Sequence, residues 1–559
     1  MTITSKYNAT RLAMAFVAVL MLPVVALAIT EHNTFWVTIT SILLPLGGYS
    51  LWVSLSRRSG RMVWAAGVFI FLSAFQIVLL YLFGNSVIAT DMFLNLITTN
   101  AGEASELLSN ILPSVIFVCL IYIPLLWKAS AHLAHKVELS DKARRGFATA
   151  GFVALVAGTV TLAASEKGSA KEVLRDDVFP INVCYNFGLS VSEAIKINNY
   201  ARTSEDFRFD AWRERVVPQR EVYVLVIGEA SRAANWQLYG YERRTTPKLW
   251  AREDIVPFGA VTTLSNTTHK SVPMMLSPIA PEHHYLLYRR KGLPAIFNEV
   301  GFETYFISNQ SPQGAMIDNL VADADHIIYI NGEEYDIRLV DEMERAINNT
   351  PARRLLFILH SYGSHYSYRL RYPREFAKYT PDDDVVISKK NIVAIRNAYD
   401  NSILYTDHFL NEVIESLNRQ PNVCSAMYYC ADHGEDLMDN GSRNFLHSSP
   451  MTTYYQTHVA SLAWFSPSYC KAFPDKVLAA RKNKFAPATT HSVFHTMADI
   501  ASVRSHFVKS SVSLVSRRFD KSAKRHYVND HNEAVELDRE IGIDALQRAL
   551  FRRAGVSMP

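Results

Sequence analysis

The stretch SAMYYCADHGEDL, residues 425–437, joins a strand-like apolar run to a group of side chains that bind metals. Asp432 and His433 follow the apolar residues directly, and Glu435 comes two positions later. Carboxylate oxygen and imidazole nitrogen together suit zinc and, less well, manganese. A single Asp-His pair after a strand is often only a polar loop, so this stretch by itself does not establish a metal site.

Two further strand-like runs end in residues of the same kind. VYVLVIG is followed by Glu229, and RLLFILH ends in His360, with His365 five positions later. His447 lies further on, in the segment NFLHSSP. Each residue alone could be a cap, a loop carboxylate or a surface histidine. In an open parallel sheet, however, ligands bind beyond the carboxyl ends of the strands. We therefore expect these side chains to gather at one edge of a sheet.

A hydroxyl-rich turn, TTLSNTTHKSVPMMLSP at residues 262–278, leads into an apolar segment of helical length. A helix N-terminus carries unpaired N–H groups and a partial positive charge, which favour an anionic group such as phosphate. A Ser or Thr at such a turn can be activated by a nearby metal as an alkoxide nucleophile. The simpler alternative is that the hydroxyls only cap the helix.

The elements that must position these residues alternate between strand and helix from Glu221 onward. Near-continuous apolar strands are separated by helical segments such as 391–418. This pattern is typical of a mostly parallel sheet that helices cover on both faces, so we expect an α/β fold. The predicted strands are 222–228, 304–309, 354–360 and 425–432.

The first 165 residues have a different composition, with five long apolar runs and few charges. Each run approaches the roughly 20 residues that cross a bilayer, which predicts a five-helix transmembrane domain. A cleavable signal peptide would explain the first run only, and four more follow it. The runs are 12–29, 34–55, 62–83, 110–127 and 147–164.

Lys and Arg gather before the first run, between the second and third runs, and between the fourth and fifth. The positive-inside rule then makes the N-terminus cytoplasmic and everything after about residue 165 external. In a Gram-negative cell this means a multi-pass inner-membrane protein with a periplasmic domain. We expect a transmembrane domain over 1–164, bridging helices over 165–218 and a catalytic domain over 219–559. The mildly amphipathic segment within 84–109 is either an external helix that contacts the membrane or the soluble domain, or a simple loop helix with no role beyond packing.

The overall charge and the cysteines limit the possible binding partners and disulfides. A net charge of +4 gives no pull toward nucleic acid. A basic stretch near the C-terminus is either a solvated face or a contact with anionic membrane. Five cysteines, of which one lies in a predicted span, permit a disulfide in the periplasm but define no pairing.

The motifs together resemble a known family. GEASRAANWQLYGYERRTTPKL, TTHKSVPMMLS, GSHYSYRLRYP, ADHGED and FLHSSP follow the five apolar runs in this order. The set is similar to the phosphoethanolamine transferases, inner-membrane enzymes of the alkaline phosphatase/sulfatase superfamily that modify lipid A or lipopolysaccharide core. The resemblance covers nearly the whole chain, although DHGE alone is shared across the superfamily.

The resemblance implies roles for individual residues. Glu229, Asp432 and His433 match zinc ligands, and Thr268 matches a nucleophile that also contacts zinc. One zinc site is implied and a second is possible in the family. The matching histidines, which hold the substrate phosphate, protonate the leaving group or bind a second zinc, are His365 and His447. His360 and Glu435 match groups that support the ligands.

The resemblance also implies a reaction. The donor would be phosphatidylethanolamine, whose phosphoethanolamine passes to Thr268 with release of diacylglycerol. It would then pass to lipid A, lipopolysaccharide or another glycan. Two departures leave the acceptor open. Ala230 follows the metal Glu where members usually have Thr, and Met274 follows the SVP motif where many lipid A enzymes have Cys.

Three other classes of protein share part of this pattern. Sulfatases need Cys or Ser followed by x-Pro-x-Arg, and Met275 stands here in place of that Arg. Phosphoglycerol transferases acting on a periplasmic glycan share five spans, a threonine nucleophile and a metal, and they stay open. A non-catalytic membrane scaffold should have lost at least one of the four principal site residues, and the chain retains all of them.

Overall fold

The computed structural model describes residues 3–31, 33–83, 87–98, 101–165, 168–312, 315–330, 334–383, 385–442, 444–448 and 452–537. The chain divides into two compact units. One comprises residues 1–94 and 107–192, and the other comprises residues 95–106 and 193–559.

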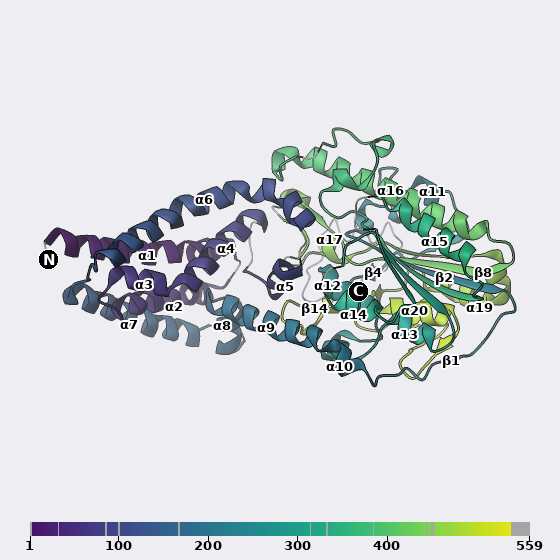
Figure 1. Ribbon diagram of the computed structural model, residues 1–559, viewed down its shortest axis with the longest axis horizontal. Helices are drawn as coiled ribbons and strands as arrows, with labels where there is room; N and C mark the ends of the chain where they lie inside the picture. The colour runs from purple at the N-terminus through teal and green to yellow at the C-terminus, as the bar shows by residue number, and fades with distance from the viewer. Residues whose placement is uncertain are drawn as a thin grey trace. The chain divides into compact units, whose positions relative to one another are not determined.

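The N-terminal part is helical and apolar, as predicted (Figure 1). Four helices are long and apolar enough to cross a membrane, and a bent pair of helices would make a fifth span. The helices are α1 (Ile3–Thr30), α2 (Phe35–Ser54), α3 (Ser59–Ala65), α4 (Gly67–Phe83), α5 (Thr90–Thr98), α6 (Ala101–Ala134), α7 (Asp141–Ala163), α8 (Ala170–Asp176) and α9 (Ile181–Asn198).

The third predicted run, 62–83, is not one straight helix. Ala66 leaves helical geometry, with φ −93° and ψ 18°, and α3 and α4 meet there at 61°. The prediction of an amphipathic helix within 84–109 falls on α5 and the start of α6. Residues 84–86, 99 and 100 and the side chains of 95–110 lie outside the described part of the chain.

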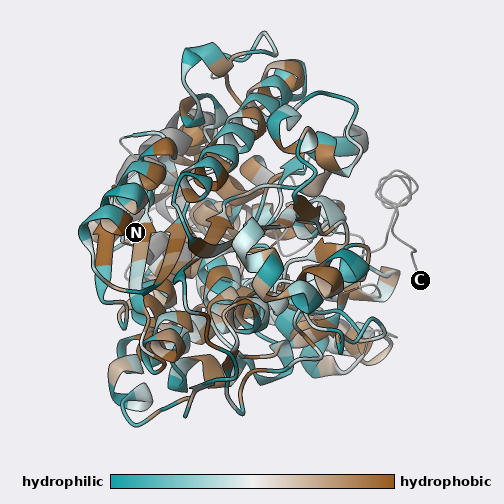
Figure 2. Cartoon of the chain, turned by 90° about the vertical axis from the view of Figure 1, so that its right-hand side faces the viewer, coloured by the Kyte–Doolittle hydropathy of each residue, from teal (hydrophilic) through white to brown (hydrophobic). Residues whose placement is uncertain are grey.

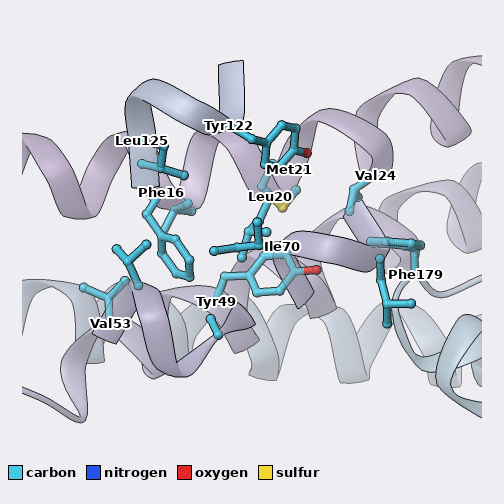
Figure 3. Close-up of a cluster of buried hydrophobic side chains, with 14 of the residues drawn as sticks. Phe16, Leu20, Met21, Val24, Tyr49, Val53, Ile70, Tyr122, Leu125 and Phe179 are labelled. Atoms are coloured by element: carbon cyan, nitrogen blue, oxygen red, sulfur yellow. The ribbon is translucent and has the colours of Figure 1, made fainter. Parts of the chain in front are cut away.

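Small residues hold α2 against α7. A Cβ atom on Gly47 would lie 2.9 Å from the carbonyl oxygen of Gly151, so the backbones approach closely. The Thr40 and Thr161 hydroxyls hydrogen-bond across the same pair at 2.8 Å. Helices in membranes pack in this way, through small residues and interhelical hydrogen bonds. Figure 3 shows part of the apolar core of this unit, with Phe16 and Leu20 of α1 among the labelled side chains.

The second unit is built on a seven-stranded sheet in the order β3-β11-β8-β2-β7-β5-β6. β8, β2, β7, β5 and β6 are parallel, and β11 runs antiparallel between β8 and β3. The prediction of a mostly parallel sheet is confirmed. The strands are β2 (Arg220–Gly228), β3 (Ile255–Pro257), β5 (Glu303–Ser308), β6 (His326–Tyr329), β7 (Arg354–His360), β8 (Val423–Ala431) and β11 (Ser461–Phe465).

Helices cover both faces of this sheet. Figure 1 shows α11, α15 and α16 on one side and α13 and α20 on the other. Every residue of β8, and every residue of β2 except Arg220, is therefore buried, which explains their unbroken apolar sequence. Figure 2 shows hydrophilic residues on the outward faces of helices and hydrophobic residues on the strands between them.

The remaining elements are short, apart from the 27-residue α16. The helices are α10 (Tyr200–Ser204), α11 (Pro247–Trp250), α12 (Thr268–Met275), α13 (Leu293–Asn298), α14 (Met316–Val321), α15 (Ile337–Asn349), α16 (Ile392–Asn418), α17 (Tyr454–Thr457), α18 (Pro467–Ala472), α19 (Pro474–Asn483) and α20 (Ser492–Ile500). The paired short strands are β1 (Trp212–Arg213) with β13 (Val503–Arg504), β4 (Val261–Thr262) with β12 (Ala488–Thr489), β9 (Asp436–Leu437) with β10 (Phe445–Leu446), and β14 (His526–Val528) with β15 (Ala534–Glu536).

Candidate metal centre and nucleophile

The three strands that end in candidate ligands are neighbours in the sheet, with β2 between β7 and β8. Glu229 follows β2, Asp432 follows β8, and His360 is the last residue of β7. The backbone N–H of Asp432 donates to the carbonyl of Gly228 at 2.9 Å, which joins two of these strand ends. The predicted gathering at one edge of the sheet therefore occurs.

The chain turns sharply after β2. Ala230 has φ +51°, a left-handed conformation that is strained for a residue with a side chain. The Tyr399 hydroxyl fixes the turn, because it donates to the Ala230 carbonyl at 2.6 Å and accepts from the Arg232 N–H at 3.0 Å. This turn directs the Glu229 side chain off the end of the strand.

Four polar side chains converge beyond the strand ends. His433 Nε2 lies 3.3 Å from Glu229 Oε1 and 3.3 Å from Asp432 Oδ2. Thr268 Oγ1 lies 3.1 Å from the same Nε2 and donates to Glu229 Oε2 at 3.3 Å. Glu229, Asp432 and His433 are completely buried.

The hydrogen bond made by Nδ1 of His433 determines whether Nε2, which faces the cluster, carries a hydrogen. His433 Nδ1 lies 2.8 Å from the carbonyl oxygen of Gly434, so Nδ1 carries a hydrogen and donates it. In the neutral ring, Nε2 then presents a lone pair to Glu229 and Asp432, whose oxygens are also acceptors. When His433 is neutral, Glu229 Oε1, 3.3 Å from its Nε2, has no hydrogen-bond donor among the described residues. Buried acceptor atoms that face one another in this way need a cation between them, either a proton or a metal ion.

The electrostatics of the cluster give the same result. Burial opposes charge on His433, but the carboxylates of Asp432 and Glu229 outweigh it and raise the pKa of His433 to about 10. Burial and the charge of Glu229 raise the pKa of Asp432 to about 7. Burial also acts against ionised Glu229, yet the bond to His433 and its charge hold the pKa of Glu229 below its ordinary value. Without a metal, the site holds a proton in its place.

Asp432 is oriented by the backbone. Its Oδ1 accepts from the N–H groups of His433 at 2.7 Å and Ala230 at 3.2 Å. These two bonds leave Oδ2 toward the cluster, where the Ser271 hydroxyl also approaches it at 3.5 Å. The carboxylate is thus positioned before any ion binds.

His447 lies against this cluster. Its ring is 3.9 Å from that of His433, centroid to centroid, and its Nδ1 lies 3.3 Å from Glu435 Oε2. Ligand atoms of Glu229, His433 and His447 fall within 4.8 Å of one another. Burial holds the pKa of His447 well below its ordinary value and raises that of Glu435 well above it.

The other two predicted histidines differ in their surroundings. His365 Nδ1 lies 2.6 Å from the Tyr366 carbonyl, and its ring stacks on Tyr362 with centroids 5.3 Å apart. Its ring is also 6.3 Å from that of His447. His360 is buried with Nδ1 3.3 Å from the Ser308 hydroxyl, and burial lowers its pKa to about 4.

Thr268 is the first residue of α12, after the N-cap Thr267. The predicted hydroxyl-rich turn therefore does lead into a helix. The N-terminal end of this helix carries a partial positive charge next to Thr268 Oγ1. A phosphoryl group approaching the hydroxyl would meet this positive end and any cation held by the cluster.

Sequence reasoning missed Gln310. Its side-chain N–H group donates to Glu229 Oε2 and to the carbonyl of Ser361, each at 3.0 Å. Gln310 lies two residues after β5, which neighbours β7. The rule that singled out the other strand ends would have found it, had amides been considered along with carboxylates and imidazoles.

The donor set fits a divalent metal ion. It offers carboxylate oxygens, an imidazole nitrogen whose tautomer is fixed from behind, and a hydroxyl, all meeting in a buried space. The unpaired Oε1 of Glu229 is the clearest sign that a partner belongs there.

The sulfatase family model matches residues 221–503, which is half of the chain and includes all these residues. The chain belongs to the sulfatase family. The Kdo(2)-lipid A phosphoethanolamine 7''-transferase of Escherichia coli K12 is 29% identical to it over 318 residues, covering 53% of this chain and 54% of that protein. The chain thus spans about half the length of the curated relatives it matches.

Solved structures share this fold. The integral membrane protein lipooligosaccharide phosphoethanolamine transferase A of Neisseria meningitidis superposes with a TM-score of 0.67 at 21% identity, over 91% of this chain and 97% of that one. The zinc complex of the C-terminal periplasmic domain of EcEptC from Escherichia coli gives a TM-score of 0.53 at 24% identity, over 59% of this chain and 95% of that one. The resemblance and the two-part architecture predicted from the sequence are confirmed.

Proposed function

We propose that this protein transfers phosphoethanolamine from phosphatidylethanolamine to lipid A or lipopolysaccharide core, through a phosphothreonine at Thr268. The observation that carries the proposal is the place of Thr268 Oγ1, 3.1 Å from His433 Nε2 and 3.3 Å from Glu229 Oε2 at a helix N-terminus. The names of the relatives above supply the phosphoethanolamine and the lipid A.

Zinc is the metal that this proposal assigns to the cluster, since a related domain is known as a zinc complex. Glu229, Asp432, His433 and Thr268 would hold it, and manganese suits the imidazole less well. When bound, zinc lowers the pKa of a hydroxyl and offsets charge on phosphoryl oxygens. His447 and His365 are close enough to take part in a second site or to contact the phosphate.

In the first step, Thr268 Oγ1 attacks the phosphorus of the donor lipid. The hydroxyl proton leaves to solvent, because Glu229, whose pKa is held below its ordinary value, is a poor base for it. The bond from Thr268 oxygen to phosphorus forms as the bond to the diacylglycerol oxygen breaks. A histidine, His365 or His447, gives that oxygen a proton.

The second step reverses these roles. An acceptor phosphate or sugar hydroxyl attacks the phosphothreonine, and the histidine that gave up its proton removes one from the acceptor. The bond between Thr268 oxygen and phosphorus breaks, and the Thr268 hydroxyl recovers its proton from solvent. His360 and Glu435 support the arrangement without contacting substrate in this scheme.

The apolar N-terminal helices suit lipid substrates. We assign residues 1–164 to the membrane, 165–218 to bridging helices and 219–559 to a periplasmic catalytic domain, with the N-terminus cytoplasmic. Donor, diacylglycerol and a lipid-linked acceptor would then share one bilayer. Sulfate-ester hydrolysis is a poor match despite the family, because Met275 occupies the position of the Arg that formylglycine formation requires.

The test uses detergent-purified full-length protein with fluorescent phosphatidylethanolamine and no acceptor. Without acceptor, each protein molecule should release at most one molecule of diacylglycerol. Adding lipopolysaccharide should make the release continuous. Thr268→Ala and a chelated sample should release none.

Phosphatidylglycerol serves as the competing donor. Reaction with this lipid alone would replace the proposal by phosphoglycerol transfer. If the zinc-loaded protein released diacylglycerol from neither lipid, the non-catalytic scaffold would be the better account.

A further inference from the structure

The N-terminal unit contains a cavity of 660 Å³ among its apolar helices. This volume lies within the range of about 300–1,000 Å³ that is typical of small-molecule sites. The walls are almost wholly apolar. They include Leu44 and Trp52 of α2, Leu155 of α7, and Phe179 and Ile181 at the start of α9.

The cavity is long in one direction. Its lining on α2 extends from Leu44 to Trp52, which at 1.5 Å per residue is about 12 Å along the helix axis. At least one side is open, since Ile181 and Cys184 line it and are exposed. A narrow apolar space with an opening suits a hydrocarbon chain better than a compact ligand.

One polar atom breaks this apolar lining. The Tyr49 side chain is only 6% exposed, and its hydroxyl has no hydrogen-bond partner among the described residues. Figure 3 shows this hydroxyl pointing toward Phe179. Buried polar groups nearly always have a partner, because leaving one unpaired costs about 1–3 kcal/mol.

Water does not answer this need. A buried water needs two to four polar partners, and the described lining offers one other hydroxyl, that of Thr159, whose hydrogen is already donated to the Leu155 carbonyl at 2.9 Å and which can therefore only accept. The missing partner therefore belongs to a molecule that is otherwise apolar and carries a hydrogen-bond acceptor.

We propose that the cavity is a glycerolipid site, in which one acyl chain lies along α2 and its ester carbonyl accepts a hydrogen bond from Tyr49. An ester carbonyl at the head of a hydrocarbon chain supplies the acceptor and the apolar body together, and the surrounding helices are apolar enough to lie in a bilayer. The proposal does not depend on transferase activity. A phospholipid and diacylglycerol share this chemistry, and the test separates them.

The chain offers matched variants. Gly48 lines the cavity and a Cβ there meets nothing within 4 Å, so Gly48→Phe fills the space without an immediate clash. Gly146→Phe is its control, on α7 with an equally open Cβ position and outside the lining. Tyr49→Phe removes the unpaired hydroxyl. Tyr122→Phe removes one that is already paired with Ser73 at 2.6 Å.

The experiment is photo-crosslinking of purified full-length protein with a phosphatidylcholine that carries a diazirine in its acyl chain, read by peptide mass spectrometry. Crosslinks should fall on residues 44–52 and 174–184. Gly48→Phe should lower them at least about tenfold, and Tyr49→Phe about five- to tenfold, the equivalent of one hydrogen bond. The two control variants should match wild type.

Competition identifies the lipid. Displacement by unlabelled diacylglycerol or by phospholipid would support the site and say which of the two it prefers. Equal displacement by a long-chain alkane, which has no hydrogen-bond acceptor, would overturn the role of the carbonyl. Crosslinks elsewhere, or equal losses in Gly48→Phe and Gly146→Phe, would overturn the site.

Discussion

The Gln310 amide donates a 3.0 Å hydrogen bond to Oε2 of Glu229, the carboxylate that we assign as a metal ligand. A second bond from the same amide to the Ser361 carbonyl, also 3.0 Å, fixes the donor itself. Glu229 Oε1 is thereby left facing His433. The orientation of the carboxylate is thus set by an amide that the sequence motifs do not include.

Replacing Gln310 with Ala should weaken zinc binding by about 10- to 100-fold, the usual effect of removing a group that orients a ligand. The measurement is competition with a chromophoric chelator on purified protein. Gln420→Ala, two residues after the end of α16, should bind zinc like wild type. Unchanged affinity in Gln310→Ala would mean that Gln310 does not position Glu229.

The site also depends on close packing at Gly363. It has φ +49°, and a Cβ there would lie 2.7 Å from the Glu229 carbonyl oxygen. Gly363→Ala should displace Glu229 and reduce diacylglycerol release by about 10²-fold, as ångström-scale misplacement does. Gly441→Ala is the control, because φ is +76° and a Cβ there meets nothing within 4 Å. Equal losses in both would point to backbone strain in place of contact with Glu229.

Thr268 can be tested by graded substitution. Thr268→Ala should reduce turnover by at least about 10³-fold, since the attacking oxygen is gone. Thr268→Ser keeps the oxygen but loses the rotamer restriction of a β-branched side chain, so we expect a loss of about tenfold. Steady-state release from fluorescent phosphatidylethanolamine measures both. Serine as inactive as alanine would indicate that the hydroxyl is not the nucleophile.

Asp407, which is not part of the metal cluster, should make the free energy of unfolding depend on pH. It caps α11 by accepting from the N–H groups of Lys248 and Leu249, both at 2.9 Å, and burial nevertheless raises its pKa to about 6. The folded protein therefore retains a proton that the unfolded chain releases near pH 4. The contribution, roughly 3 kcal/mol, is full below pH 4 and is lost as pH rises through 6.

Asp407→Asn cannot titrate and provides the baseline. Tm should be measured for wild type and for this variant from pH 4 to 8. The Tm of wild type should fall relative to that of the variant as pH rises to about 6, and the difference should then stay constant. A difference that does not change with pH would show that Asp407 has an ordinary pKa.

Much of this arrangement could be predicted from sequence because long apolar strands are strong local signals. β2 and β8 lie within two residues of the predicted strands, and α16 begins and ends within one residue of its prediction. The clustering of Glu229 with Asp432 followed from the rule that ligands bind beyond the carboxyl ends of parallel strands.

Other features had no local signal. The antiparallel β11 lies between β8 and β3 because of long-range pairing, which a five-residue run does not reveal. The bend at Ala66 lies within a uniformly apolar run. The contact between His447 and His433 depends on how a loop folds back, and nothing in the spacing of the two residues encodes it.

The measurement that tests the central claim most directly is peptide mass spectrometry of zinc-loaded full-length protein after brief incubation with phosphatidylethanolamine and no acceptor. The account predicts phosphoethanolamine on the peptide that contains Thr268, fragment ions that place it on that residue, and its loss when lipopolysaccharide is added. Diacylglycerol release with Thr268 unmodified and the adduct on another residue, or with no adduct at all, would contradict it.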